Sequence, residues 1–125
     1  MCTYLNPSYK VEIAEEDIVC YKIVNAESSY CMSYYQNYKY TFGEVYKTDY
    51  FSPEDPWEGD TIENGAFHSY KELESALIDI EDMKDASIVR CHIPKGSKYV
   101  LGYDLDDFPC YVSEKIVIDQ VYNTW

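Results

Sequence analysis

Short runs of β-branched and aromatic residues, separated by turn-forming residues, most constrain the fold of this chain. The clearest runs cover residues 18–24, 87–93 and 98–103, and the C-terminal half of 110–122 alternates in the same way. Val, Ile, Tyr and Phe favour strands because their branched or flat side chains pack well on a pleated surface. The sequence therefore predicts a sheet-based protein in which strands outnumber helices.

One helical pattern interrupts these runs. Ser69 and Glu72 have the spacing of a capping box, which predicts that a helix begins there. The apolar residues that then recur at three- and four-residue spacing are Leu73, Ala76, Leu77, Ile80 and Met83. We expect an α+β meander: a mostly antiparallel, curved sheet with one principal amphipathic helix, at about residues 70–85, packed on it.

The connections between the runs carry turn signals. Pro94 and Gly96 lie between the runs 87–93 and 98–103, so we expect these two runs to form a hairpin. Gly43 interrupts a local alternation of aromatic residues and predicts a bulge or a bend. The Pro-, Gly- and acid-rich segment 51–65 is expected to be an exposed loop.

The length of 125 residues suits one domain, with residues 1–16 as a weakly defined N-terminal arm. No stretch approaches the roughly 18 consecutive apolar residues of a membrane-spanning helix. The first residues also lack the basic start and apolar run of a signal peptide. We therefore expect no membrane interaction and a cytoplasmic location.

The cysteines and histidines give no sign of a metal or catalytic site. The five cysteines are odd in number and widely spaced, as is typical of reduced thiols in a cytosol. Cys91 and His92 are adjacent, but neighbouring side chains of a strand point to opposite faces. The sequence also has no phosphate-binding glycine loop, nucleophile elbow or metalloprotease helix. We predict no catalytic residue, metal or cofactor, which makes an enzyme the less favoured class.

The formal net charge of -13 narrows the range of partners. Such a charge repels nucleic acid and anionic membranes, so direct binding to either is not expected. It favours a basic partner, or a protein that imitates nucleic acid. A simpler alternative is that the charge only keeps a tyrosine-rich surface soluble.

The tyrosine-rich segment 30–50 is the main candidate for recognition, because exposed rings on a curved sheet can stack on a ligand or on a partner's side chain. Tyr38, Tyr40 and Phe42 alternate and are expected on one face. The predicted binding residues are Tyr35, Tyr38, Tyr40, Tyr46, Trp57, Lys22 and His68. The alternative is that these rings fill the core or form cross-strand ladders.

The C-terminal third resembles the ends of small uncharacterised phage and prophage proteins. The segment from Ile88 to Ile118 contains an IPKGS-Y hairpin and a SEKI strand, and GAFHSY, from Gly65 to Tyr70, precedes the helix. The resemblance implies a phage-like origin, and hence action in a host cytoplasm.

A second, weaker similarity is to ADP-ribosyltransferase folds. Residues 93–99 look like the turn of those proteins, and residues 67–69 look like their Ser-bearing segment. The Glu-x-Glu expected before the turn is replaced by Val89-Arg90-Cys91, and Tyr21-Lys22 stands where an arginine would open the first strand. This resemblance implies a nucleotide-handling enzyme with Tyr21, His68 and Ser69 near its site, but without the carboxylate that transfer requires.

These observations favour a non-catalytic acidic binding protein that engages a host protein or sequesters a small ligand, including a nucleotide-like one. The ADP-ribosyltransferase-like enzyme and the nucleic-acid mimic are the alternatives. Open sheet edges and the odd number of thiols also permit a homodimer.

Overall fold

The computed structural model describes residues 5, 9–26, 31–33, 39–48, 51, 66–83, 86–104 and 106–122, with the backbone alone for 25–26, 31–33 and 39–40. These residues contain ten strands and one helix. In chain order the elements are β1 (Glu12–Ile13), β2 (Ile18–Ala26), β3 (Cys31–Ser33), β4 (Lys39–Tyr40), β5 (Val45–Lys47), β6 (Phe67–Tyr70), α1 (Leu73–Ile80), β7 (Ser87–Ile93), β8 (Lys98–Tyr103), β9 (Pro109–Ser113) and β10 (Lys115–Val121).

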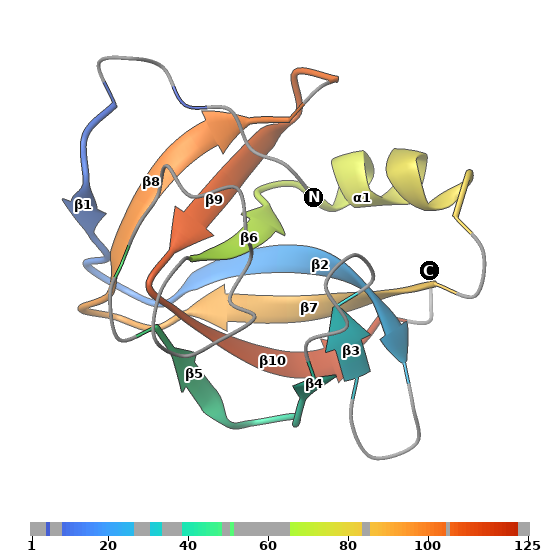
Figure 1. Ribbon diagram of the computed structural model, residues 1–125, viewed down its shortest axis with the longest axis horizontal. Coiled ribbons are helices and arrows are strands. Elements are labelled where there is room, and N and C mark those ends of the chain that lie inside the picture. The colour runs from blue at the N-terminus through green and yellow to red at the C-terminus, as the bar shows by residue number, and fades with distance from the viewer. Residues whose placement is uncertain are drawn as a thin grey trace.

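The strands form one curved sheet in the order β1-β8-β9-β6-β2-β7-β10-β5, with β3 and β4 attached to β2. Every pairing in it is antiparallel. In Figure 1, β8 and β9 run steeply across the direction of β2, β7 and β10, so the sheet bends over on itself. The predicted α+β class and antiparallel, curved sheet are confirmed for the described residues, whereas the predicted meander is wrong because neighbours in this order are mostly distant in sequence.

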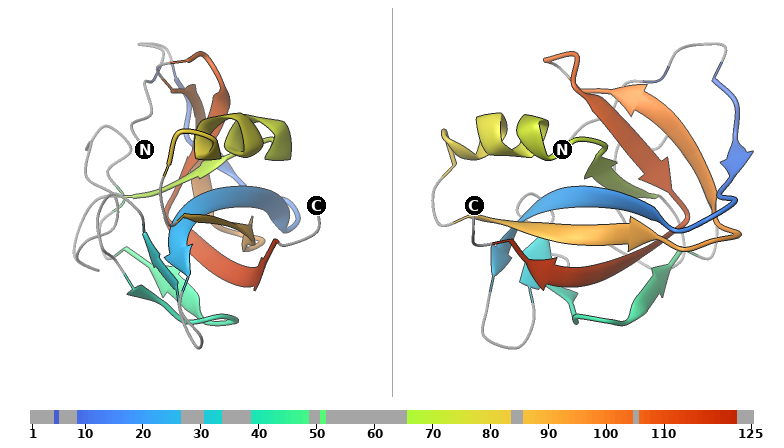
Figure 2. Two further views of the ribbon diagram at one scale, coloured as in Figure 1. Left: turned by 90° about the vertical axis from the view of Figure 1, so that its right-hand side faces the viewer. Right: turned by 180° about the vertical axis from the view of Figure 1, so that it is seen from behind.

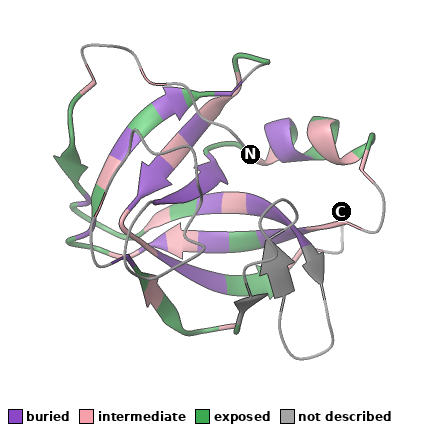
Figure 3. Cartoon of the chain, in the orientation of Figure 1, coloured by how far each residue is buried: buried purple, intermediate pink, exposed green. Residues whose placement is uncertain are grey.

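The centre of the sheet is the pair β2 and β7, which confirms the strands predicted at 18–24 and 87–93. Seven cross-strand pairs join them, from Ile18↔Ile93 to Val24↔Ser87. Both faces of this pair carry buried apolar residues, with Val24 and Val89 on one face and Ile23 and Ile88 on the other, which is why these two runs stand out in the sequence. Figure 3 shows buried residues alternating with intermediate and exposed ones along these two strands, whereas β1 and β5, at the two ends of the sheet, are largely exposed.

Two hydrophobic clusters lie on opposite faces of β2 and β7. The larger cluster consists of Ala14, Cys20, Val24, Phe67, Val89, Cys91, Ile93, Ile116 and Ile118. The smaller cluster, which includes residues of α1, consists of Ile23, Tyr70, Ala76, Ile88 and Cys110. Helix α1 contacts β2, β6 and β7, and Figure 2 shows it along one side of the sheet. The amphipathic helix therefore packs on the sheet as predicted.

The helix is shorter than predicted, and its expected capping box is absent. It covers Leu73–Ile80 instead of about 70–85, and its N-cap residue is Glu72, without a side-chain cap hydrogen bond. Ser69 lies in β6, opposite Tyr111 of β9, and its buried Oγ has no hydrogen-bond partner among the described residues. Pairing within the sheet therefore determines the conformation of Ser69, although its spacing from Glu72 suits a cap.

The predicted hairpin of residues 87–93 and 98–103 is also wrong. Strand β7 pairs with β2 and β10, whereas β8 pairs with β1 and β9. The turn between them is held by the N-terminal segment: Gly96 donates to the Ala14 carbonyl at 2.8 Å, and Ala14 donates to the Ser97 carbonyl at 2.9 Å. Gly96 has a φ of +88°, a left-handed conformation that favours glycine. The turn residues indicate a change of direction but do not determine which strands then pair.

Two further predictions are corrected in detail. The run 110–122 contains two strands, β9 and β10, because the extended strand is interrupted at Glu114. The N–H of Glu114 donates to the Lys98 carbonyl at 3.0 Å. The bend predicted at Gly43 is confirmed, with a φ of +83°. Phe42 lies in this turn, whereas Tyr38 and the side chain of Tyr40 lie outside the described structure, so their shared face stays a prediction.

The central pair makes a direct prediction about stability. Replacing the fully buried Ile93 by Ala leaves a cavity in the larger hydrophobic cluster, and should lower the free energy of unfolding by about 3 kcal/mol. The same change at Ile78, which is 53% exposed on α1, should cost less than about 0.5 kcal/mol. Urea unfolding of both variants measures the difference, and equal losses would contradict this account of the core.

Candidate functional site

The structure has a groove of about 830 Å³ beside the edge strand β1. It is lined by Glu12, Ile13, Glu15, Glu16, Asp17, Ile18 and Tyr99. These residues come from β1, from the connection between β1 and β2, from the first residue of β2, and from β8. The groove therefore joins the N-terminal segment to a strand that follows it by more than eighty residues.

The pairing of β1 with β8 forms one wall of the groove. Glu12 lies opposite Tyr99, whose hydroxyl donates to Glu12 Oε2 at 3.0 Å. The Tyr99 ring meets the ring of Tyr111 edge to face at 5.8 Å, and both rings pack against the larger hydrophobic cluster. Burial, followed by the neighbouring Glu12 carboxylate, raises the pKa of Tyr99. Tyr99 therefore remains a neutral hydrogen-bond donor that holds Glu12 in place.

The connection at residues 14–17 is fixed at both ends. Ala14 is 2% exposed and makes the two backbone hydrogen bonds to the turn at residues 96 and 97. Asp17 Oδ1 accepts the backbone N–H of Lys95 at 2.9 Å. Glu15 and Glu16, between these anchors, are exposed. The segment thus presents two solvated carboxylates on a constrained backbone.

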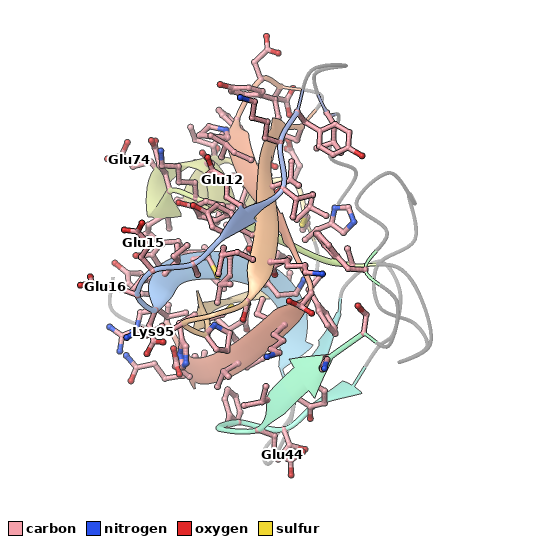
Figure 4. All side chains as sticks on the ribbon, turned by 90° about the vertical axis from the view of Figure 1, so that its left-hand side faces the viewer. Glu12, Glu15, Glu16, Glu44, Glu74 and Lys95 are labelled. Atoms are coloured by element: carbon pink, nitrogen blue, oxygen red, sulfur yellow. The ribbon has the colours of Figure 1, made fainter. Side chains whose placement is uncertain are left out.

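The charges of the groove have one sign. Four of its seven lining residues are acidic, and none is basic. Figure 4 shows Glu12, Glu15 and Glu16 projecting from the same side of the molecule, which also carries Glu74 of α1. The described lining of the groove contains no cysteine, serine or histidine. This arrangement suits binding of a cationic group.

Two of the predicted binding residues meet inside the protein. Lys22 and His68 are 3% and 1% exposed, and Lys22 Nζ donates to the backbone carbonyl of His68. Burial, followed by the nearby Lys22 charge, lowers the pKa of His68 to about 3. His68 is therefore neutral at physiological pH. Both side chains lie in the interior of the described structure and not on a ligand-accessible face.

The other predicted residues lie partly outside the described structure. Tyr46 of β5 is half-buried, packs against the larger hydrophobic cluster, and has its hydroxyl 3.4 Å from Glu44 Oε2. Tyr40 belongs to β4, but its side chain is outside the description. Tyr35, Tyr38 and Trp57 lie outside the described residues, as does most of the predicted loop 51–65. Recognition through the tyrosine-rich segment stays a prediction.

The sequence interpretation missed two groups that the structure brings together. The groove carboxylates escaped notice because all but Asp17 fell in the expected arm, residues 1–16, although the acidic residues are close together in sequence. The second group is a surface pair of β7 and β10, in which His92 Nδ1 lies 2.9 Å from Asp119 Oδ2. A β-bulge between residues 118 and 120 makes their pairing hard to foresee from sequence spacing. Cys91 is fully buried on the opposite face of β7, so it does not join this pair.

One further cluster has the donor type that metal cations prefer. Carboxylate oxygens of Asp79, Asp104 and Asp106 lie within 4.8 Å of one another. Asp104 Oδ1 already accepts the backbone N–H groups of Asp106 and Phe108, each at 2.9 Å. The Tyr70 hydroxyl donates to Asp79, whose pKa is raised by burial and by the carboxylates of Asp104 and Asp106. Exposed carboxylates often gather without an ion, and no second feature at this position indicates one.

Comparisons with known proteins assign no family. No protein-family model matches the chain, and neither a curated protein nor a solved structure shows significant similarity to it. The two resemblances noted from the sequence therefore stay predictions. Within the described residues, no helix has the length and apolar character needed to span a bilayer. The site must be interpreted from its own geometry.

Burial of His68 predicts a pH dependence of stability. Since its folded pKa is about 3 and its ordinary value is 6.5, the unfolded chain binds the extra proton between these values. Stability contributed by neutral His68 is present above pH 6.5 and is lost as pH falls toward 3, by up to about 1.4 kcal/mol per pH unit. Urea unfolding at several pH values should show a shallower acid loss in His68→Leu than in the wild type.

A spectroscopic measurement tests the same claim if His68→Leu does not fold. The imidazole NMR signals of His68 in the folded wild type should stay constant between about pH 8 and 5, because a group with a pKa near 3 remains neutral in that range. A His68 titration with a midpoint near 6.5 would refute the assigned burial.

The cluster of Asp79, Asp104 and Asp106 predicts the opposite dependence of folding stability on pH. Because the folded pKa of Asp79 is raised above 3.8, its ionised form destabilises the fold, and stability is lost as pH rises through this range. Asp79→Asn should raise the thermal midpoint at pH 7, and this gain should disappear in acid. The asparagine oxygen still accepts the Tyr70 hydroxyl. Asp82→Asn, which changes a smaller contribution to the same pKa, is the control and should have a smaller effect.

Proposed function

We propose that this protein is a non-catalytic binding protein that holds a basic segment of a partner protein in the acidic groove beside β1. The observation that carries the proposal is the groove of about 830 Å³, of whose seven described lining residues four are acidic and none is basic. The net charge of -13 adds a long-range attraction that accelerates the approach of a cationic partner.

The apolar lining favours lysine and arginine side chains over a simple metal cation. Ile13, Ile18 and the Tyr99 ring lie among the carboxylates. Long basic side chains bury their methylene stems on apolar surface while their charged ends reach carboxylates. An aromatic ring also attracts a cation placed over its face. A phosphate-bearing ligand would instead meet four like charges, so the groove does not favour nucleic acid or a nucleotide.

The identity of the partner is the less direct part of the proposal. The resemblance of the C-terminal third to phage and prophage proteins favours a host protein as the source of the basic segment. A protein surface that normally binds nucleic acid is rich in lysine and arginine, so its charge would complement the acidic groove. Competition between this protein and DNA for such a partner would support the nucleic-acid-mimic form of the same function.

Binding of a fluorescent hexalysine peptide to the full chain tests the proposal. Fluorescence anisotropy should show saturable binding that weakens steeply between 50 and 500 mM NaCl, since these charges are exposed to solvent. Glu15→Gln/Glu16→Gln should weaken binding about three- to tenfold at low salt, the loss expected for two exposed charge pairs.

A matched double variant separates the groove from the overall charge. Glu44→Gln/Glu81→Gln changes the net charge equally, at exposed positions that do not line the groove. Figure 4 shows Glu44 at the far end of the molecule from the groove carboxylates. This variant should bind within twofold of the wild type. Equal weakening by both double variants, or no saturable binding at 50 mM NaCl, would refute the groove as the binding site.

A further inference from the structure

The outer edge of β1 is open in the described structure. The sheet order ends at β1, whose only described neighbour is β8. Val11 and Ile13 on this edge are 48% and 54% exposed. An open edge presents backbone N–H and C=O groups that pair readily with another extended chain. The groove proposed above as the binding site lies beside the same edge, since Glu12 and Ile13 line it.

The hydrogen bonds of Ala14 fix which backbone groups face outward. Ala14 N–H points toward the β8 side, because it donates to Ser97 at 2.9 Å. Successive N–H groups of a strand point to opposite edges, so Glu12 shares the direction of Ala14. Val11 and Ile13 therefore direct their N–H and C=O groups away from β8. An added antiparallel strand would exchange hydrogen bonds with these two residues.

The side chains on β1 define the composition of such a strand. Residues directly opposite each other in neighbouring strands share a face of the sheet. A residue opposite Glu12 lies beside its carboxylate, whereas residues opposite Val11 and Ile13 lie beside exposed apolar side chains. In antiparallel pairing, the N-terminal end of the added strand approaches Glu15 and Glu16. The matching segment is therefore basic at its N-terminal end and alternates basic with apolar residues after it.

We infer that the groove and the β1 edge together bind an extended basic segment of a partner protein as an additional antiparallel strand. This inference rests on the proposed function and names the conformation and residue pattern of the ligand. A second copy of this chain does not fit the edge, because it carries the same net charge of -13 and the same groove carboxylates, and the like charges would repel each other. Charge complementarity selects a basic partner instead.

The test uses three peptides of identical charge with the full chain. The parent is acetyl-Lys-Lys-Val-Lys-Val-amide, in which the valines lie opposite Ile13 and Val11 and the last lysine lies opposite Glu12. One derivative is N-methylated at both valines, which removes the N–H groups that face β1. The other is N-methylated at the second and third lysines, whose N–H groups face away. Isothermal titration and amide NMR shifts of Val11 and Ile13 report binding.

The two methylated peptides should differ in affinity although they have the same composition. The valine-methylated peptide should bind at least about tenfold more weakly than the parent, because two hydrogen bonds are lost. The lysine-methylated peptide should bind within about twofold of the parent. Three outcomes would overturn antiparallel pairing: equal binding of all three peptides, equal loss of affinity in both derivatives, or loss of affinity in the lysine-methylated peptide alone. Each of them would leave the acidic groove as the site. Absence of binding by the parent and by hexalysine would refute the proposed function itself.

A variant of the chain provides an independent check. Ile13→Pro removes the outward N–H at the edge but none of the bonds that hold β1 to β8, and proline is tolerated on edge strands. It should weaken binding of the parent peptide at least about threefold while the thermal midpoint and NMR dispersion stay near those of the wild type. Ile13→Ala keeps the N–H and is the matched control. Equal affinity of the two variants in their folded state would overturn the inference.

Discussion

The pairing of β2 with β7 is the constraint on which the rest of the structure depends. Its seven cross-strand pairs place Cys20 and Val24 in one hydrophobic cluster and Ile23 in the other. Strands β6, β9, β8 and β1 continue the sheet from β2, whereas β10 and β5 continue it from β7. The acidic groove is thus reached from the centre in two ways, through the series of pairings that ends at β1 and directly through Ile18 of β2. Burial on both faces stabilises the pair strongly, because neither strand can separate without opening both clusters.

The buried side chain of Lys22 reinforces the pairing of β2 with β6, which has one register pair. Strand β6 meets β2 at one register pair, Tyr21↔Tyr70, and the Lys22 ammonium adds a second link by donating to the His68 carbonyl. Placing a charge inside a protein is costly unless it is hydrogen-bonded, and a misplaced β6 would leave this charge without that acceptor. Lys22 therefore favours one relative position of β2 and β6, which apolar contacts alone would determine less sharply.

Sequence reasoning identified the elements of this fold better than their partners. The runs at 18–24 and 87–93 were recognisable because strands buried on both faces contain few polar residues. Ser69 misled the prediction of the helix start because its spacing from Glu72 is also compatible with a place in β6. Pro94 and Gly96 identified a turn, but the pairing beyond it depends on Ala14, which is remote in sequence. The groove was not predictable from local patterns, since β1 has only two residues. One wall of the groove also depends on Tyr99, which lies 87 positions from Glu12 in the sequence.

The carboxylates on and beside β1 oppose pairing between copies of this chain at the open edge. Exposed edges with apolar residues such as Val11 and Ile13 invite pairing between copies, and proteins oppose this with charged side chains on the edge. Glu12, Glu15 and Glu16 have that effect on a second copy of this acidic chain, because like charges would be brought together. In the proposed function the same carboxylates would attract a basic strand, so one set of side chains would oppose self-association and favour a cationic partner. Specificity of this kind arises from the difference between two interaction energies, and a neutral edge of the same shape would not provide it.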